Sequence, residues 1–158
     1  MITKDQHLLN MALWQARYSR DPNTKVGAIL VSTRGHQVGA CNHLPKGCFD
    51  NPLEILEDRP RKLQAIVHAE MAAICEAARG GVPTEDATLY IACTDDTRNV
   101  WGGCPCTNCA KHVVNAGIKR VVTYERKTGF SKWHEELELA EGWLKNAGIE
   151  VTYVPYQE

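Results

Sequence analysis

The sequence predicts an α/β fold of three layers, in which a five-stranded mixed sheet carries helices on both faces. Short apolar runs of strand length alternate with amphipathic stretches of helical period along the 158 residues. Helices between successive strands favour parallel pairing with right-handed crossovers, next to one hairpin. A chain of this length supports one sizeable core, so we expect a single domain over residues 1–158.

The first part of the chain predicts one helix, one hairpin and one long loop. An apolar stripe of period 3.6 follows Thr3, a suitable N-cap, and predicts a helix over residues 3–19. Strands are expected at 26–32 and 37–42, joined by a turn that contains glycine. Residues 43–61 hold three prolines and little periodicity, which predicts a loop that forms one wall of the substrate site.

The second part predicts three helices that alternate with three strands. Glycine or proline follows each helical pattern, as expected at helix ends. The helices are expected at 67–79, 107–116 and 131–146, and the strands at 88–93, 118–124 and 149–154.

Composition and charge restrict the location and the partners. The hydrophobic fraction is 44% and the charged fraction 23%, and no apolar run is long enough for a membrane span. The N-terminus lacks the apolar segment of a signal peptide, so we expect a cytoplasmic protein. A net charge of −1 without a basic stripe favours a small-molecule substrate over a stable nucleic-acid partner.

Two short motifs carry the chemistry. His68-Ala69-Glu70 and Pro105-Cys106-Thr107-Asn108-Cys109 offer one imidazole and two thiolates. Three protein ligands with water in the fourth position are typical of catalytic zinc sites. We therefore predict one catalytic Zn²⁺ held by His68, Cys106 and Cys109.

Glu70 is the candidate proton shuttle because it is not needed as a zinc ligand. Zinc lowers the pKa of bound water to about 7, so hydroxide is available at neutral pH. Glu70 would carry a proton from that water to the substrate. The alternatives are a structural role for Glu70 at the start of a helix, and a structural or redox role for the Cys-x-x-Cys pair.

The remaining cysteines leave a second metal site open. The chain has seven cysteines and no export signal, so metal and thiol chemistry explain them better than disulfides. A second, structural zinc would draw on Cys41, His43, Cys48 or Cys104.

The motif His-x-Glu followed by Pro-Cys-x-x-Cys is the signature of zinc-dependent nucleobase deaminases. Together with the segments at 19–31, 39–48, 67–74 and 105–122, it makes the chain resemble the deoxycytidylate (dCMP) deaminases of the cytidine deaminase-like superfamily. The resemblance implies the cytidine deaminase-like fold and hydrolysis of dCMP to dUMP and ammonia, with attack at C4 and Glu70 as the shuttle.

The resemblance also implies substrate contacts and partners. Asn42 would hydrogen-bond the deoxyribose, Ala69 would line the substrate site, and Lys25 and Lys46 are candidates for the 5′-phosphate. It further implies a homo-oligomer, with a hexamer favoured, and regulation by dCTP (activating) and dTTP (inhibiting).

Residues 94–104 depart from the family pattern, because they lengthen the connection that leads to the cysteine pair. Within this insertion, Trp101 is a candidate to stack on a base and Arg98 to meet phosphate. Alternative activities are therefore kept: deamination of dCTP, of 5-substituted dCMP, of a tRNA adenosine, or of a guanine- or pterin-like ring. A non-catalytic nucleotide-binding relative is a further alternative, although such a protein needs neither Glu70 nor the complete ligand set.

Overall fold

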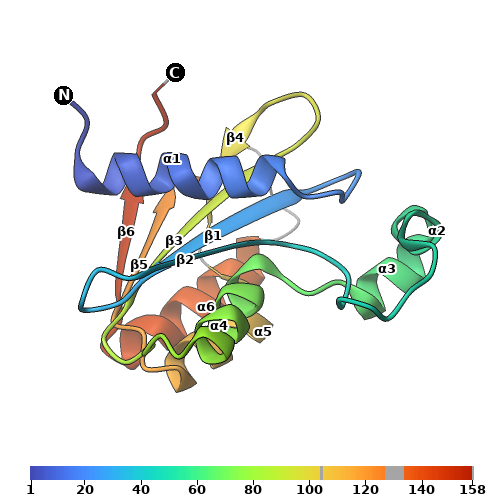
Figure 1. The fold of residues 1–158 in the computed structure, drawn as a ribbon. Coiled ribbons are helices and arrows are strands. Elements are labelled where there is room, and N and C mark those ends of the chain that lie inside the picture. The colour runs from blue at the N-terminus through green and yellow to red at the C-terminus, as the bar shows by residue number, and fades with distance from the viewer. Residues whose placement is uncertain (104, 127–133, 158) are drawn as a thin grey trace.

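The computed structural model describes residues 1–103, 105–126 and 134–157 (Figure 1). A single mixed sheet runs through it. Its strands are β1 (Lys25–Val31), β2 (Gln37–Cys41), β3 (Thr88–Thr94), β4 (Val100–Trp101), β5 (Arg120–Tyr124) and β6 (Glu150–Val154). The order along the sheet is β2-β1-β3-β5-β6, with β4 paired to β3.

The strand pairing confirms the predicted mixed sheet. β1 pairs antiparallel with both β2 and β3, while β3–β5 and β5–β6 are parallel. The sheet has a sixth strand that was not predicted, because β4 is only two residues long and lies in the polar insertion. Trp101 pairs with Cys93 and Val100 with Thr94, so the insertion returns alongside the end of β3.

Helices cover both faces of the sheet, as predicted. They are α1 (Lys4–Arg17), α2 (Pro52–Glu57), α3 (Arg59–Ala65), α4 (Ala69–Gly80), α5 (Thr107–Asn115) and α6 (His134–Asn146). Figure 1 shows α1 across one face and α4, α5 and α6 side by side on the other. This is the three-layer α-β-α arrangement.

Two apolar cores hold the layers together. Buried residues of α1, among them Leu9 and Leu13, pack with Tyr90 and Val122 of the sheet. The larger core lies between the opposite face and α4–α6, where alanines of α4 permit close packing. Gly27 allows the approach of α1, because a Cβ at this position would overlap the backbone carbonyl of Ala12.

The predicted loop at 43–61 is only partly a loop, since two short helices occupy most of its second half. Pro52 and Pro60 lie in the first turns of α2 and α3, where proline's fixed φ is favourable and its missing N–H costs nothing. The side chain of Asp58 accepts a hydrogen bond from the N–H of Arg61 and caps α3. Pro52 and Pro60 start helices here, whereas the prolines and the weak periodicity of this stretch predicted a loop.

Other helix boundaries differ by a few residues. α4 begins at Ala69 because Val67 forms a bridge with His43 and His68 becomes the N-cap. The predicted start of the last helix at Ser131 lies outside the described residues. Within the described ranges, none of the helices combines the length and the apolarity that crossing a bilayer requires.

Candidate active site

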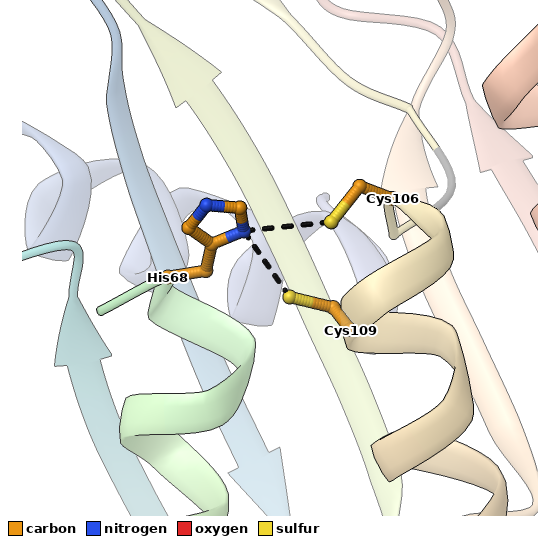
Figure 2. A group of neighbouring side chains, drawn as sticks. All are labelled: His68, Cys106 and Cys109. Atoms are coloured by element: carbon orange, nitrogen blue, oxygen red, sulfur yellow. Dashed lines mark hydrogen bonds between the residues drawn. The ribbon is translucent and has the colours of Figure 1, made fainter. Parts of the chain in front are cut away.

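The two sequence motifs meet where the N-termini of α4 and α5 lie next to each other. His68 is the N-cap of α4 and Cys106 the N-cap of α5, with Cys109 in the first turn of α5. Nδ1 of His68 lies 3.4 Å from the Cys106 sulfur and 3.3 Å from the Cys109 sulfur (Figure 2). Helix N-termini carry partial positive charge, which favours thiolates at this position.

The donor set fits zinc. The ligand atoms of His68, Cys106 and Cys109 lie within 4.8 Å of one another, close enough to share one ion. One imidazole and two sulfurs are ligands that zinc accepts, and three of them leave one coordination position open. His68 is exposed and Cys109 buried, so the centre is accessible from the histidine side.

A second metal site does not form among the described residues. They contain no other group of three metal-binding side chains, so Cys41, His43 and Cys48 do not assemble one. Cys104, the fourth candidate for that site, lies outside the described residues.

The two thiols already differ in their affinity for a proton. The pKa of Cys106 is lowered, first by the Cys109 thiol and then by His68, because both favour the thiolate form. The pKa of Cys109 is raised, first because it donates to Cys106 and second because it is buried. The pair therefore favours one thiolate before any metal binds.

Glu70 lies in the first turn of α4, two residues after His68, and is only 6% exposed. Burial is the main cause that raises the pKa of its carboxyl, and the negative charge on Cys106 adds to it. Cys106, His68 and Cys109 all influence the pKa of this carboxyl, so Glu70 lies close to the three candidate zinc ligands. A carboxyl with a raised pKa in this place is suited to general acid–base work.

A pocket of about 300 Å³ lies along the segment that follows β2, and its lining does not include the three candidate zinc ligands or Glu70. Asn42 and His43 line it, and the bridge between His43 and Val67 brings its wall to the residue before His68. Leu44, Pro45 and Lys46 continue the wall, so the segment after β2 lines a cavity, and its role as a wall of the substrate site stays a prediction. Arg20 also lines the pocket and is exposed.

Asn42 is buried in the wall and held on both sides of its carboxamide. Its Oδ1 accepts a hydrogen bond from the N–H of Val26 at 2.9 Å, and its Nδ2 donates to the carbonyl of Thr24 at 2.9 Å. Nδ2 also lies 3.4 Å from the carboxylate of Asp21. The predicted contact of Asn42 with deoxyribose stays a prediction, and the network fixes the side chain at the pocket.

Asp21 and Lys62 form a buried ion pair that sequence reasoning missed. Oδ1 of Asp21 lies 3.1 Å from Nζ of Lys62, and both side chains are 5% exposed. The pair connects α3 to the segment that follows α1. A lysine in a polar, proline-containing stretch looks like a solvated one, so only the fold reveals this contact.

The two lysines considered for the phosphate have protein partners. Nζ of Lys25 donates to the carbonyls of Ser19 and Asp21 at 2.7 and 2.8 Å. Lys46 lines the pocket and lies 2.6 Å from the carboxylate of Glu76. Arg20 makes no ion pair or hydrogen bond within the part of the chain that the structure describes, and the sequence alone does not indicate it as a site residue.

The remaining candidates are placed as follows. Ala69 is fully buried as the first residue of α4. Trp101 is half-buried in β4, and Arg98 is exposed in the turn before it with φ 62°. Asp96 of the same turn lies 3.5 Å from Lys25, so the insertion contacts the start of β1.

Comparison with known proteins agrees with this geometry. The model of the family "Cytidine and deoxycytidylate deaminase zinc-binding region" matches residues 2–125. The chain is therefore a hydrolytic deaminase with Zn²⁺ as its cofactor. Within that class it belongs to the cytidine and deoxycytidylate deaminase family.

Individual relatives extend over nearly the whole chain. Deoxycytidylate deaminase of Mus musculus is 30% identical over 149 residues, which are 91% of this chain and 75% of the mouse protein. A deaminase of Aliivibrio fischeri, described as uncharacterized and lying in the luxG 3′ region, is 29% identical over 98% of this chain and 97% of its own length. The apo dCMP deaminase of cyanophage S-TIM5 has the same fold, with a TM-score of 0.69 at 22% identity over 98% of this chain and all of that one.

Proposed function

We propose that this deaminase acts on dCMP and releases dUMP and ammonia. The observation that carries the proposal is the convergence of His68, Cys106 and Cys109 with a buried Glu70 beside them. The choice of dCMP is supported by the similarity to the mouse deoxycytidylate deaminase over most of both chains. The pocket of about 300 Å³ that Asn42 lines lies in the size range of small-molecule sites.

Glu70 would move the protons of the reaction. When bound, zinc supplies the Lewis acidity that lowers the pKa of a coordinated water. The Glu70 carboxylate takes a proton from water and delivers it to N3 of the cytosine ring while the water oxygen bonds to C4. It then transfers the second water proton to the exocyclic amine, the C4–N bond breaks, and ammonia leaves as the C4 carbonyl forms.

We propose that Arg20 binds the 5′-phosphate. Arginine presents several N–H donors to a phosphate, and Arg20 lines the pocket. Lys25 is less suited, because its ammonium already donates to two backbone carbonyls. Asn42, held at the same wall, is the proposed contact to the sugar.

The test of the reaction is ammonia release from dCMP by the zinc-loaded protein, compared with Glu70→Gln. We expect turnover by the wild type and a rate about 10² to 10⁴ times lower for the variant, with its zinc retained. dCTP, 5-methyl-dCMP, guanine and adenosine-containing RNA are assayed in parallel. Turnover of one of these but not of dCMP would assign another substrate, and equal rates for both proteins would remove Glu70 from the mechanism.

The assembly and its regulation are proposed from the family resemblance. We propose a single catalytic domain over residues 1–158 that forms a cytoplasmic homo-oligomer, with a hexamer favoured. We also propose dCTP as activator and dTTP as inhibitor, without a stable nucleic-acid partner. Light scattering of the purified protein, repeated with each nucleotide, measures the assembly, and dCMP turnover under the same conditions measures the regulation.

A further inference from the structure

The last helix reaches the zinc-ligand helix through one carboxylate. Oε1 of Glu136 in α6 accepts hydrogen bonds from the N–H and the hydroxyl of Thr107, at 3.3 and 2.9 Å. Thr107 is the first residue of α5 and lies between Cys106 and Cys109 in the sequence. The carboxylate therefore holds the turn of backbone that carries both thiolates.

The first turn of α5 needs such a partner. The first N–H groups of a helix have no acceptor within the helix, and an N-cap side chain usually supplies one. Cys106 is the N-cap of α5 and makes no side-chain capping bond, because its sulfur belongs to the metal-ligand group. The N–H of Thr107 instead finds its acceptor in another element, α6.

The negative charge of Glu136 also suits its position beside a helix N-terminus and a cation site. A carboxylate at a helix N-terminus interacts favourably with the helix dipole, and one near a divalent cation adds to the attraction for the ion. The neighbouring acids of α6 differ, since Glu135 is exposed and Glu138 pairs with His134 at 2.9 Å.

We propose that Glu136 is a positioning residue of the zinc centre. It fixes the first turn of α5 so that Cys106 and Cys109 face His68, and it thereby raises the affinity for Zn²⁺. The match to the family model ends at residue 125, so this contact comes from a part of the chain beyond it. The proposal depends on the zinc centre and not on which base is deaminated.

The test is the retention of zinc by the folded protein. Zinc-loaded wild type, Glu136→Ala and Glu135→Ala are titrated with a chromogenic chelator, and no substrate is used. We expect Glu136→Ala to bind zinc about 10- to 100-fold more weakly, which is the usual effect of removing a group that orients a metal ligand. Glu135→Ala, the exposed neighbour, should match the wild type. Glu136→Gln keeps an acceptor oxygen but loses the charge, so its affinity for zinc should lie between those of the wild type and Glu136→Ala.

A spectroscopic measurement separates positioning from simple packing. In the Co²⁺-substituted protein, the thiolate-to-cobalt absorption should shift or weaken in Glu136→Ala and remain unchanged in Glu135→Ala. Wild-type zinc affinity and cobalt spectrum in Glu136→Ala, even with lower thermal stability, would overturn the proposal. If Glu136→Ala does not fold, Thr107→Val and Thr107→Ser replace it. The valine variant should bind zinc more weakly than the serine variant, and equal affinities would contradict the proposal.

Discussion

The carboxylate of Asp21 organises the pocket wall at the scale of single residues. Its Oδ1 accepts from the N–H groups of Asn23 and Thr24 at 2.8 and 3.3 Å, and it pairs with the buried ammonium of Lys62. Oδ2 faces Asn42. A buried charge is tolerated only when it is paired and hydrogen-bonded, and Asp21 meets both conditions.

Breaking this ion pair should destabilise the protein strongly. Lys62→Met leaves the carboxylate of Asp21 buried without its counter-charge, so we expect a loss of about 3 to 5 kcal/mol in the free energy of unfolding. Urea denaturation measures it. Arg61→Met is the control on the same helix, because Arg61 forms only an exposed ion pair with Glu54 and should change stability by less than about 1 kcal/mol. Similar losses in both variants would contradict a special role for the buried pair.

The proposed phosphate contact is tested by comparing two substrates. Loss of a charge-assisted hydrogen bond of about 1.5 to 3 kcal/mol should raise KM for dCMP about 10- to 100-fold in Arg20→Ala. Deoxycytidine lacks the phosphate, so its weaker turnover should not change further. Arg17→Ala is the matched control, since Arg17 stacks on Trp14 and is not part of the pocket lining. An unchanged KM for dCMP in Arg20→Ala would place the phosphate elsewhere.

At the scale of elements, the contact between α1 and β1 depends on a missing side chain. Gly27 lies in β1 directly below the backbone of α1, where a Cβ would meet the carbonyl of Ala12 and the N–H of Ala16. Backbone atoms of a packed helix cannot move aside as a flexible side chain can. The distance between these two layers is therefore set by glycine.

Gly27→Ala should force the helix away from the sheet and cost about 1 to 3 kcal/mol or more. Thermal unfolding of the zinc-loaded protein is the measurement. Gly39→Ala in the adjacent β2 is the control, because its Cβ would meet mainly the end of the Gln15 side chain, which can rotate away. If both variants melt at the same temperature, the close approach is not a constraint on stability.

Elements with a strong local pattern were predictable from the sequence, and elements that depend on distant partners were not. The apolar stripe of α1, the His-x-Glu motif at 68–70 and the Cys-x-x-Cys motif at 106–109 are local signals. They predicted the helix and the three metal-binding side chains that the structure brings together. α2 and α3 depend on caps and on Lys62 reaching Asp21, a residue 41 positions away. Glu136 was not predictable for the same reason, because its partner Thr107 lies on another helix.

At the scale of the whole molecule, one ion pair connects the N-terminal helix to β5, two strands away from β1 in the sheet. The guanidinium of Arg120 in β5 lies 2.7 Å from the carboxylate of Asp5 in α1, and Tyr90 of β3 donates to the same carboxylate at 2.9 Å. The hydrogen bond from Arg120 is the main cause that lowers the pKa of Asp5. Burial and the hydrogen bond to Asp5 raise the pKa of Tyr90 to about 12.

The sign of the resulting pH dependence follows from linkage. A carboxyl whose pKa is lower in the folded state stabilises the protein above its unfolded pKa, near 4, and loses that contribution as pH falls through the folded value. We expect Asp5→Asn to be less stable than the wild type by about 1 to 3 kcal/mol at pH 7. The difference between the two should shrink below pH 4. Urea denaturation at pH 7, 5 and 3 measures the difference in stability between Asp5→Asn and the wild type. A difference that stays constant with pH would contradict a stabilising role of the Asp5 carboxylate.

The separation of the metal ligands along the chain has a consequence for how this fold can vary. His68 and Cys106 are 38 residues apart, so an ion that joins them closes a long loop containing β3 and the insertion. The entropy of closing a flexible loop grows only with the logarithm of its length, and doubling that length costs about 0.6 kcal/mol. The chain between the ligands can thus gain or lose residues, as at 94–104, with little penalty from chain entropy. Length at this position is therefore a property in which related sequences can diverge while the reaction centre is kept.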